Sequence, residues 1–226
     1  MLFSKQLEVT SSEAVNHDTR LITFSLPANE ISVHNLEKPG TIQILVKKYP
    51  GGRASGHLHS LSPGDELTVR GPLPTYEWKT STVERDVVFI AGGAGITPIY
   101  SLARGVLQED GRIKIHLLWG VNSSKDILLD KQLTELKAHA GDGLQITYFV
   151  SGDEAKAGSV PAEFKPGRIT EAALSQVLQS IGKEKLGDEK GTKVFLCGPP
   201  AMEEALAGKN GVFTQLGITK KAIHRF

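Results

Sequence analysis

Two predicted strands of this chain end in glycine-containing turns that could bind a phosphate group. The apolar run Val87–Ala91 predicts a short buried strand, and it leads directly into Gly92-Gly93-Ala94-Gly95-Ile96-Thr97-Pro98. The paired glycines allow a sharp turn, Thr97 could cap the following helix, and Pro98 suits its first turn. Backbone N–H groups at such a turn can hold a dinucleotide pyrophosphate. An ordinary βα turn would also need glycine, so this motif alone leaves both interpretations open.

A second strand end of the same kind lies far along the chain. Lys193–Leu196 predicts another short strand, which ends in Cys197-Gly198-Pro199-Pro200-Ala201-Met202. Two prolines cannot continue a strand, but they can open a helix, and Glu203–Leu206 continues one. If both strands belong to one parallel sheet, their carboxyl ends face a single crevice. Open α/β sheets bind nucleotides in such a crevice.

The elements that position these ends fall into two parts. In the first third, Leu21–Phe24 and Ile42–Val46 are rich in β-formers and Ser62–Asp65 supplies a turn, which favours a small antiparallel β-barrel. From Asp86 strands alternate with helical stretches, which predicts a parallel α/β sheet. Its expected strands are Val87–Ala91, Ile113–Trp119, Leu144–Val150 and Lys193–Leu196.

Two helices and one long connection complete this expectation. Leucines at helical spacing follow Asp126, and a second amphipathic stretch covers Ala172–Ile181. Gly152–Gly167 is expected to be a long polar connection that skirts the nucleotide site.

Composition excludes several classes of function. The 26 basic and 25 acidic residues balance, so nothing supports nucleic-acid binding. The single cysteine excludes an intramolecular disulfide and suits a reducing compartment. His57 and His59 alone have a metal-ligand spacing, and two histidines in a polar turn are more often solvated than ligands. No apolar run approaches the roughly 20 residues that span a bilayer, and the N-terminus lacks a signal peptide's apolar core. We therefore expect a soluble, cytoplasmic chain.

The pair of motifs, GGAGITP and CGPPAM, together with the terminal aromatic Phe226, resembles the flavin-dependent ferredoxin reductase superfamily, and more closely NADH–cytochrome b5 reductase. Other segments are similar to the same family. They are His17–Pro27, Leu45–Ser55, Asp65–Pro72 and Asn122–Leu129. The resemblance implies an FAD-binding barrel over residues 1–80 and an NAD(P)-binding α/β domain over residues 84–226.

The resemblance also implies roles for residues in the flavin domain. Lys47 and Tyr49 would line FAD, and Arg53, Ala54 and Ser55 would contact its pyrophosphate. Without the resemblance, Lys47 reads as an exposed strand lysine and Arg53 as a solvated turn residue.

In the nucleotide domain the implied hydride transfer needs no general acid from the protein, only stacked rings and excluded water. Thr97 would meet the flavin side, and Cys197 would orient the hydride at the nicotinamide without being ionised. The remaining implied contacts to the nucleotide or flavin are Gly92, Gly93, Ala94, Gly95, Ile96, Pro98, Gly198, Pro199, Pro200, Met202 and Phe226. For Cys197 a buried filler, and for Phe226 a frayed terminus, is the alternative.

The sequence gives weaker indications of the preference between NADH and NADPH and of the electron acceptor. A carboxylate after the strand Leu144–Val150 would bind the ribose diol and repel a 2′-phosphate, but Ser151 stands there, with Asp153 and Glu154 later. On the overall match we expect NADH, with NADPH as the alternative. The resemblance implies a one-electron acceptor such as cytochrome b5, or a quinone, and a monomer. Family members are often tethered to endoplasmic-reticulum or mitochondrial outer membranes, by an anchor that would end before this chain begins.

One family feature is missing. An Arg-x-Tyr-Ser/Thr flavin motif should lie between Pro27 and Thr41, yet no arginine or tyrosine stands between Pro27 and Lys47. The flavin domain therefore looks shortened near residues 28–40. Three explanations fit: a truncated or misassembled chain, a divergent reductase that holds FAD by its remaining contacts, or a nucleotide-binding protein that has lost the flavin.

Overall fold

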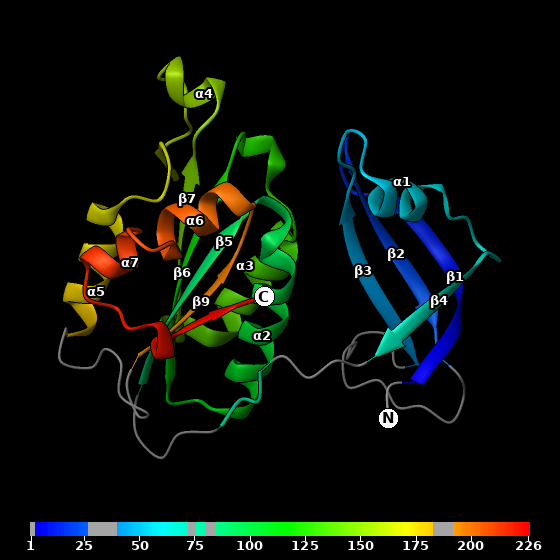
Figure 1. The fold of residues 1–226 in the computed structure, drawn as a ribbon, viewed down its shortest axis with the longest axis horizontal. Helices are drawn as coiled ribbons and strands as arrows, with labels where there is room; N and C mark the ends of the chain where they lie inside the picture. The colour runs from blue at the N-terminus through cyan, green and yellow to red at the C-terminus, as the bar shows by residue number, and fades with distance from the viewer. Residues whose placement is uncertain (1–2, 27–39, 72–75, 80–84, 183–191) are drawn as a thin grey trace. The chain divides into compact units, whose positions relative to one another are not determined.

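A computed structural model describes residues 3–26, 40–71, 76–79, 85–182 and 192–226. The chain divides into two compact units, Met1–Thr75 and Tyr76–Phe226 (Figure 1). Residues 28–39, where the flavin motif was sought, lie outside the described residues. No helix of the described part is long and apolar enough to cross a membrane.

The first unit is an antiparallel sheet with one helix. Its strands, in the spatial order β3-β2-β1-β4, are β1 (Phe3–Ala14), β2 (Thr19–Ser25), β3 (Thr41–Lys47) and β4 (Glu66–Gly71). Helix α1 (Arg53–Ser60) joins β3 to β4. Leu7, Val9, Ile22 and Phe24 are buried on one face of this sheet, with Leu58 and Leu61 packed among them.

The second unit is built on a six-stranded parallel sheet in the order β10-β9-β5-β6-β7-β8. Its strands are β5 (Arg85–Gly92), β6 (Ile113–Val121), β7 (Leu144–Val150), β8 (Phe164–Pro166), β9 (Lys193–Cys197) and β10 (Ile223–Arg225). The central strands are buried on both faces, which explains their nearly continuous apolar sequences.

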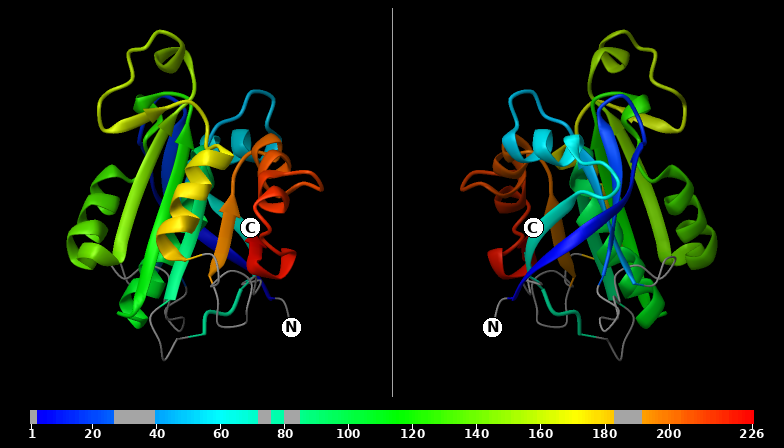
Figure 2. Two further views of the ribbon diagram at one scale, coloured as in Figure 1. Left: turned by 90° about the vertical axis from the view of Figure 1, so that its left-hand side faces the viewer. Right: turned by 90° about the vertical axis from the view of Figure 1, so that its right-hand side faces the viewer.

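Helices cover both faces of the parallel sheet (Figure 2). On one face lie α2 (Ile96–Glu109) and α3 (Asp130–Ala140), and on the other α5 (Glu171–Ile181), α6 (Pro200–Ala207) and α7 (Val212–Gln215). Leu178, Leu206 and Phe213 from the second group are buried against strand residues such as Ile90 and Leu196. The short helix α4 (Asp153–Lys156) follows β7.

The expected fold class is confirmed: an antiparallel β unit precedes a parallel α/β unit, and each predicted strand is present within a few residues. In two places the structure contains elements that the sequence did not predict. The stretch from Gly152 to Gly167 is not a plain connection, because it contains α4 and the edge strand β8. Strand β1 was not expected, since only Leu7 and Val9 of its central residues are buried among polar neighbours.

Candidate functional site

The two glycine-containing strand ends lie side by side. From β5 the chain runs outward through β6, β7 and β8, then returns to place β9 on the other side of β5. Ala91 pairs with Cys197 in this parallel register, so both strands end at the same edge of the sheet. The point where the strand order reverses is where open α/β sheets bind their ligands.

Backbone approaches backbone at this point. A Cβ atom on Gly95 would strike the carbonyl oxygen of Cys197, and one on Gly92 would strike the sulfur of Met202. A Cβ atom on Gly198 would lie 2.8 Å from the same sulfur and 3.4 Å from the Cα of Gly92. These glycines are therefore needed for close packing of two turns, whether or not a ligand is bound.

The first turn is held by side chains from within it and from β6. Gly93 has a φ of +51°, a conformation that favours glycine. The indole Nε1 of Trp119 donates to the Gly93 carbonyl at 3.0 Å, and the Thr97 hydroxyl donates to the Ala94 carbonyl at 3.1 Å. Sequence reasoning missed Trp119, although a buried tryptophan at a strand end needs a partner for its N–H.

The expected cap of α2 is wrong. Gly95 is the N-cap residue and makes no side-chain cap bond, because Thr97 lies inside the first turn and its hydroxyl is turned back to a carbonyl. Pro98 does occupy that turn, as predicted. Pro98 has no N–H to donate, and the Ile96 N–H is directed back to the carbonyls of Gly93 and Ala94 in the preceding 3-10 turn.

The second turn opens α6 as expected, with Pro199 at the N-cap and Pro200 as the first helical residue. Cys197 is half-buried just before it. Burial raises the pKa of the Cys197 thiol, and the Glu203 carboxylate raises it further. The thiol is therefore neutral at neutral pH, in agreement with a role that does not require a thiolate.

The C-terminal residue is anchored. The Phe226 N–H donates to the Leu196 carbonyl at 3.2 Å, directly after β10 pairs with β9. The Phe226 ring lies 5.0 Å from the His224 ring and is 39% exposed. Burial lowers the pKa of His224, so a neutral imidazole supports the partly exposed phenyl ring at neutral pH.

In the first unit the candidate FAD contacts gather around the β3–α1 connection. Helix α1 begins at Arg53, so the expected turn through Ala54 and Ser55 is instead the first turn of a helix without acidic residues. The Ser55 hydroxyl accepts from the Tyr49 N–H at 3.2 Å, and the Tyr49 side chain is 53% exposed. A helix N-terminus of this kind attracts an anion.

Lys47 is less free than the sequence suggested. Its Nζ lies 2.8 Å from Asp18 Oδ2, in an ion pair that sequence reasoning missed. Although burial raises the pKa of Asp18, the hydrogen bonds from Lys47 and Thr19 outweigh it and lower the pKa. Asp18 therefore holds the Lys47 ammonium at the end of β3.

A further set of contacts joins the connections that follow β6 and β7. The Ser123 hydroxyl donates to Glu154 Oε1 at 2.6 Å, and the Ser124 N–H donates to Glu154 Oε2 at 3.1 Å. The Gly152 N–H donates to the Asn122 carbonyl at 2.8 Å. Glu154 was considered only as a ribose ligand, whereas here its carboxylate fastens two loops together.

Comparison with known proteins matches both units. The protein-family model of the oxidoreductase NAD-binding domain matches residues 89–208, and the family model of the oxidoreductase FAD-binding domain matches residues 30–78. The NADH-cytochrome b5 reductase 2 of Pyricularia oryzae is 32% identical, over 97% of this chain and 75% of the relative. The chain belongs to the NADH–cytochrome b5 reductase family. It is accordingly an NAD(P)H-dependent flavoprotein reductase.

A second relative and two solved structures are also similar to this chain. The reductase 2 of Meyerozyma guilliermondii is 33% identical over 86% of this chain and 65% of the relative. The cytochrome b5 reductase domain of Ulva prolifera nitrate reductase superposes with a TM-score of 0.76, at 24% identity, over 99% of this chain and 97% of that one. The human Ncb5or CS-b5R domains, in the NAD+ form, superpose with a TM-score of 0.75 at 23% identity, over 100% of this chain and 70% of that one. At such identities the superpositions bear on the fold alone.

Gly95→Ala should weaken the binding of NADH. The added Cβ would collide with the Cys197 carbonyl and push the two turns apart, and calorimetry measures the resulting loss of affinity. Gly105→Ala is the matched control, because it lies on the same helix with open space around its Cα and should leave affinity unchanged. Equal affinity in all three proteins would make the turn an ordinary βα connection.

Alkylation of Cys197 by iodoacetamide should be slow at pH 7 and should keep accelerating above pH 9, the ordinary pKa of a cysteine thiol. The thiolate is the reactive form, and burial together with Glu203 keeps it scarce. Mass spectrometry of the single cysteine across a pH series measures the rate. A plateau below pH 9 would contradict the raised pKa.

Proposed function

We propose that this protein transfers a hydride from NADH to FAD and passes the electrons on to cytochrome b5. The observation that carries the proposal is the apposition of the Gly92–Pro98 and Cys197–Met202 turns at the point where strand order reverses. The family match supports both the donor and the acceptor. A quinone is the second candidate acceptor, and NADPH the second candidate donor.

The residues of the nucleotide unit have definable tasks in this reaction. The backbone N–H groups of the glycine turn before α2 would bind the pyrophosphate, and the Trp119 bond fixes the turn that presents them. Cys197 would place its neutral sulfur beside the nicotinamide and orient the ring. Thr97 would stand at the same edge, with its hydroxyl oxygen still able to accept a hydrogen bond.

The first unit would hold FAD through residues around the start of α1. When bound, FAD accepts two electrons as a hydride and can release them singly. The acid-free start of α1, the Arg53 side chain beside it and the exposed Tyr49 ring suit a pyrophosphate and an aromatic ring. The residues therefore fit this cofactor, even though the family's arginine and tyrosine motif is not found in the sequence.

The alternative is a nucleotide-binding protein that has lost flavin and reductase activity. The alignment with the Pyricularia relative extends over 260 residues, more than the 226 of this chain, so part of the relative has no counterpart here. Such a difference is expected if the flavin domain is shortened. The match of residues 30–78 to the FAD-binding model favours the flavoenzyme over this alternative.

Cys197→Ala should slow the reduction of FAD by NADH more than it weakens NADH binding. A side chain that orients the hydride donor contributes mainly in the transition state, and so affects the rate more than the affinity. Stopped-flow absorbance at saturating NADH measures the rate, with calorimetry for the affinity. An unchanged rate would show that Cys197 is only a packing residue.

Added FAD should raise the melting temperature of the purified protein, and much of that protein should be free of FAD. The missing arginine would contribute about 1.5–3 kcal/mol through a charge-assisted phosphate contact, or roughly ten- to a hundredfold in affinity. Thermal melts at a series of FAD concentrations test this. Dialysis-resistant, stoichiometric FAD would contradict weak binding, whereas a melting curve that FAD never shifts would favour the alternative function.

A further inference from the structure

The two carboxylates that follow β7 in the described part of the chain differ in their surroundings: Glu154 is bonded within the fold, and Asp153 forms an exposed ion pair. Glu154 accepts from the Ser123 hydroxyl and the Ser124 N–H, and these bonds lower its pKa. Asp153 Oδ1 lies 2.8 Å from Lys156 Nζ. Ser151, which directly follows β7, is uncharged and its hydroxyl donates to the Val121 carbonyl.

A cation stands at the same edge. The Gly167 N–H donates to the Val150 carbonyl at 2.7 Å, so the residues that follow Gly167 and Val150 begin from one point of the sheet. Those residues are Arg168 and Ser151. The Arg168 side chain is exposed, and no residue in the described part of the chain forms an ion pair with it.

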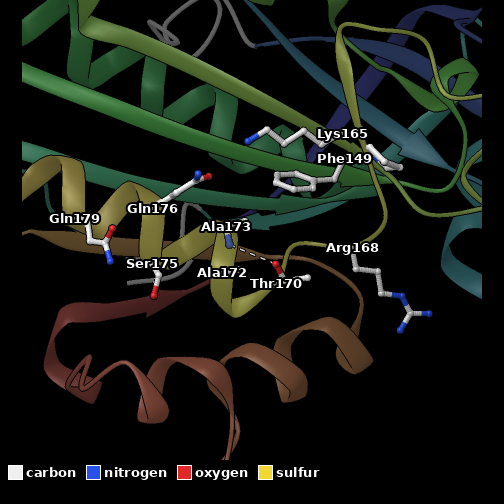
Figure 3. A pocket seen from close by; sticks show the side chains of 10 residues that line it. Phe149, Lys165, Arg168, Thr170, Ala172, Ala173, Ser175, Gln176 and Gln179 are labelled. Atoms are coloured by element: carbon white, nitrogen blue, oxygen red, sulfur yellow. Dashed lines mark hydrogen bonds between the residues drawn. The ribbon is translucent and has the colours of Figure 1, made fainter.

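Arg168 lies at the rim of a hollow of about 560 Å³ between the β7–β8 edge and α5 (Figure 3). The other cation of the hollow, Lys165, is turned the opposite way and lies over the Phe149 ring, with its Nζ 6.0 Å from the ring centroid. The side chains of the two cations that line this hollow therefore extend in opposite directions. Lys165 lies against the sheet over Phe149, whereas the Arg168 side chain extends away from it.

These observations concern the one group that distinguishes NADPH from NADH. A carboxylate at the ribose end repels a 2′-phosphate, and an arginine nearby accommodates it. Here Glu154 is bonded to Ser123 and Ser124, Asp153 is paired with Lys156, the residue directly after β7 is an uncharged serine, and an arginine is present. A bidentate guanidinium suits a phosphate better than it suits a diol.

We propose that Arg168 binds the 2′-phosphate of NADPH, so that the protein oxidises NADPH as well as NADH. The inference rests on the proposed nucleotide site and adds a specificity-determining residue to it. Glu154 then acts as a positioning residue, because it fixes the loops after β6 and β7 without contacting the ribose.

Calorimetry of the FAD-supplemented protein with NADP+ and NAD+, which differ only in the 2′-phosphate, tests the role of Arg168. The wild-type protein should bind NADP+ at least as tightly as NAD+. Arg168→Ala should weaken NADP+ about tenfold and leave NAD+ unchanged, since a charge-assisted phosphate contact is lost. Arg168→Lys should retain part of the affinity. Lys165→Ala is the matched control and should change neither affinity.

Steady-state kinetics provides a second readout. Arg168→Ala should raise the KM for NADPH about tenfold, leaving its kcat and both constants for NADH unchanged. Wild-type protein that binds NAD+ but not NADP+, or an Arg168→Ala variant that loses both equally, would overturn the role of Arg168 and leave the proposed function standing. Wild-type protein that binds neither nucleotide would overturn both.

Discussion

The nucleotide unit depends on the contact between the backbones of two strand ends. Gly95 meets the Cys197 carbonyl, and Gly92 faces Gly198 beneath the Met202 sulfur. Such proximity leaves no room for a Cβ, and it requires β5 and β9 to be neighbours with their ends in register. The return of the chain across the sheet, the helices that make the crossovers and the prolines that open α6 all serve this one arrangement.

Much of this arrangement could be predicted from the sequence, for identifiable reasons. Apolar runs such as Val87–Ala91 and Leu144–Val150 are buried on both faces, so their boundaries are sharp. The glycines and prolines at the ends of β5 and β9 determine the conformation of their own backbone, and this effect does not depend on contacts with distant segments. The carboxyl ends of parallel strands share one edge of a sheet, so the two ends could be placed at one crevice, and the family resemblance then implied its ligands.

What could not be predicted depends on contacts between distant segments. The bond from Trp119 to Gly93, the ion pair of Lys47 with Asp18 and the bonds to Glu154 each join residues far apart in sequence. The sequence alone does not show which distant partner each of these side chains meets. The Thr97 error is of a different kind, because the cap residue was misjudged by two positions where a 3-10 turn, Gly93–Gly95, precedes α2.

The pairing of β10 with β9 joins the last residues of the chain to the strand that ends in Cys197. The Phe226 N–H is bonded to Leu196, the residue immediately before that cysteine, and its ring rests on His224. Any peptide fused after Phe226 would start from a backbone fixed within the sheet. An affinity tag attached there would therefore extend directly from the edge strand β10.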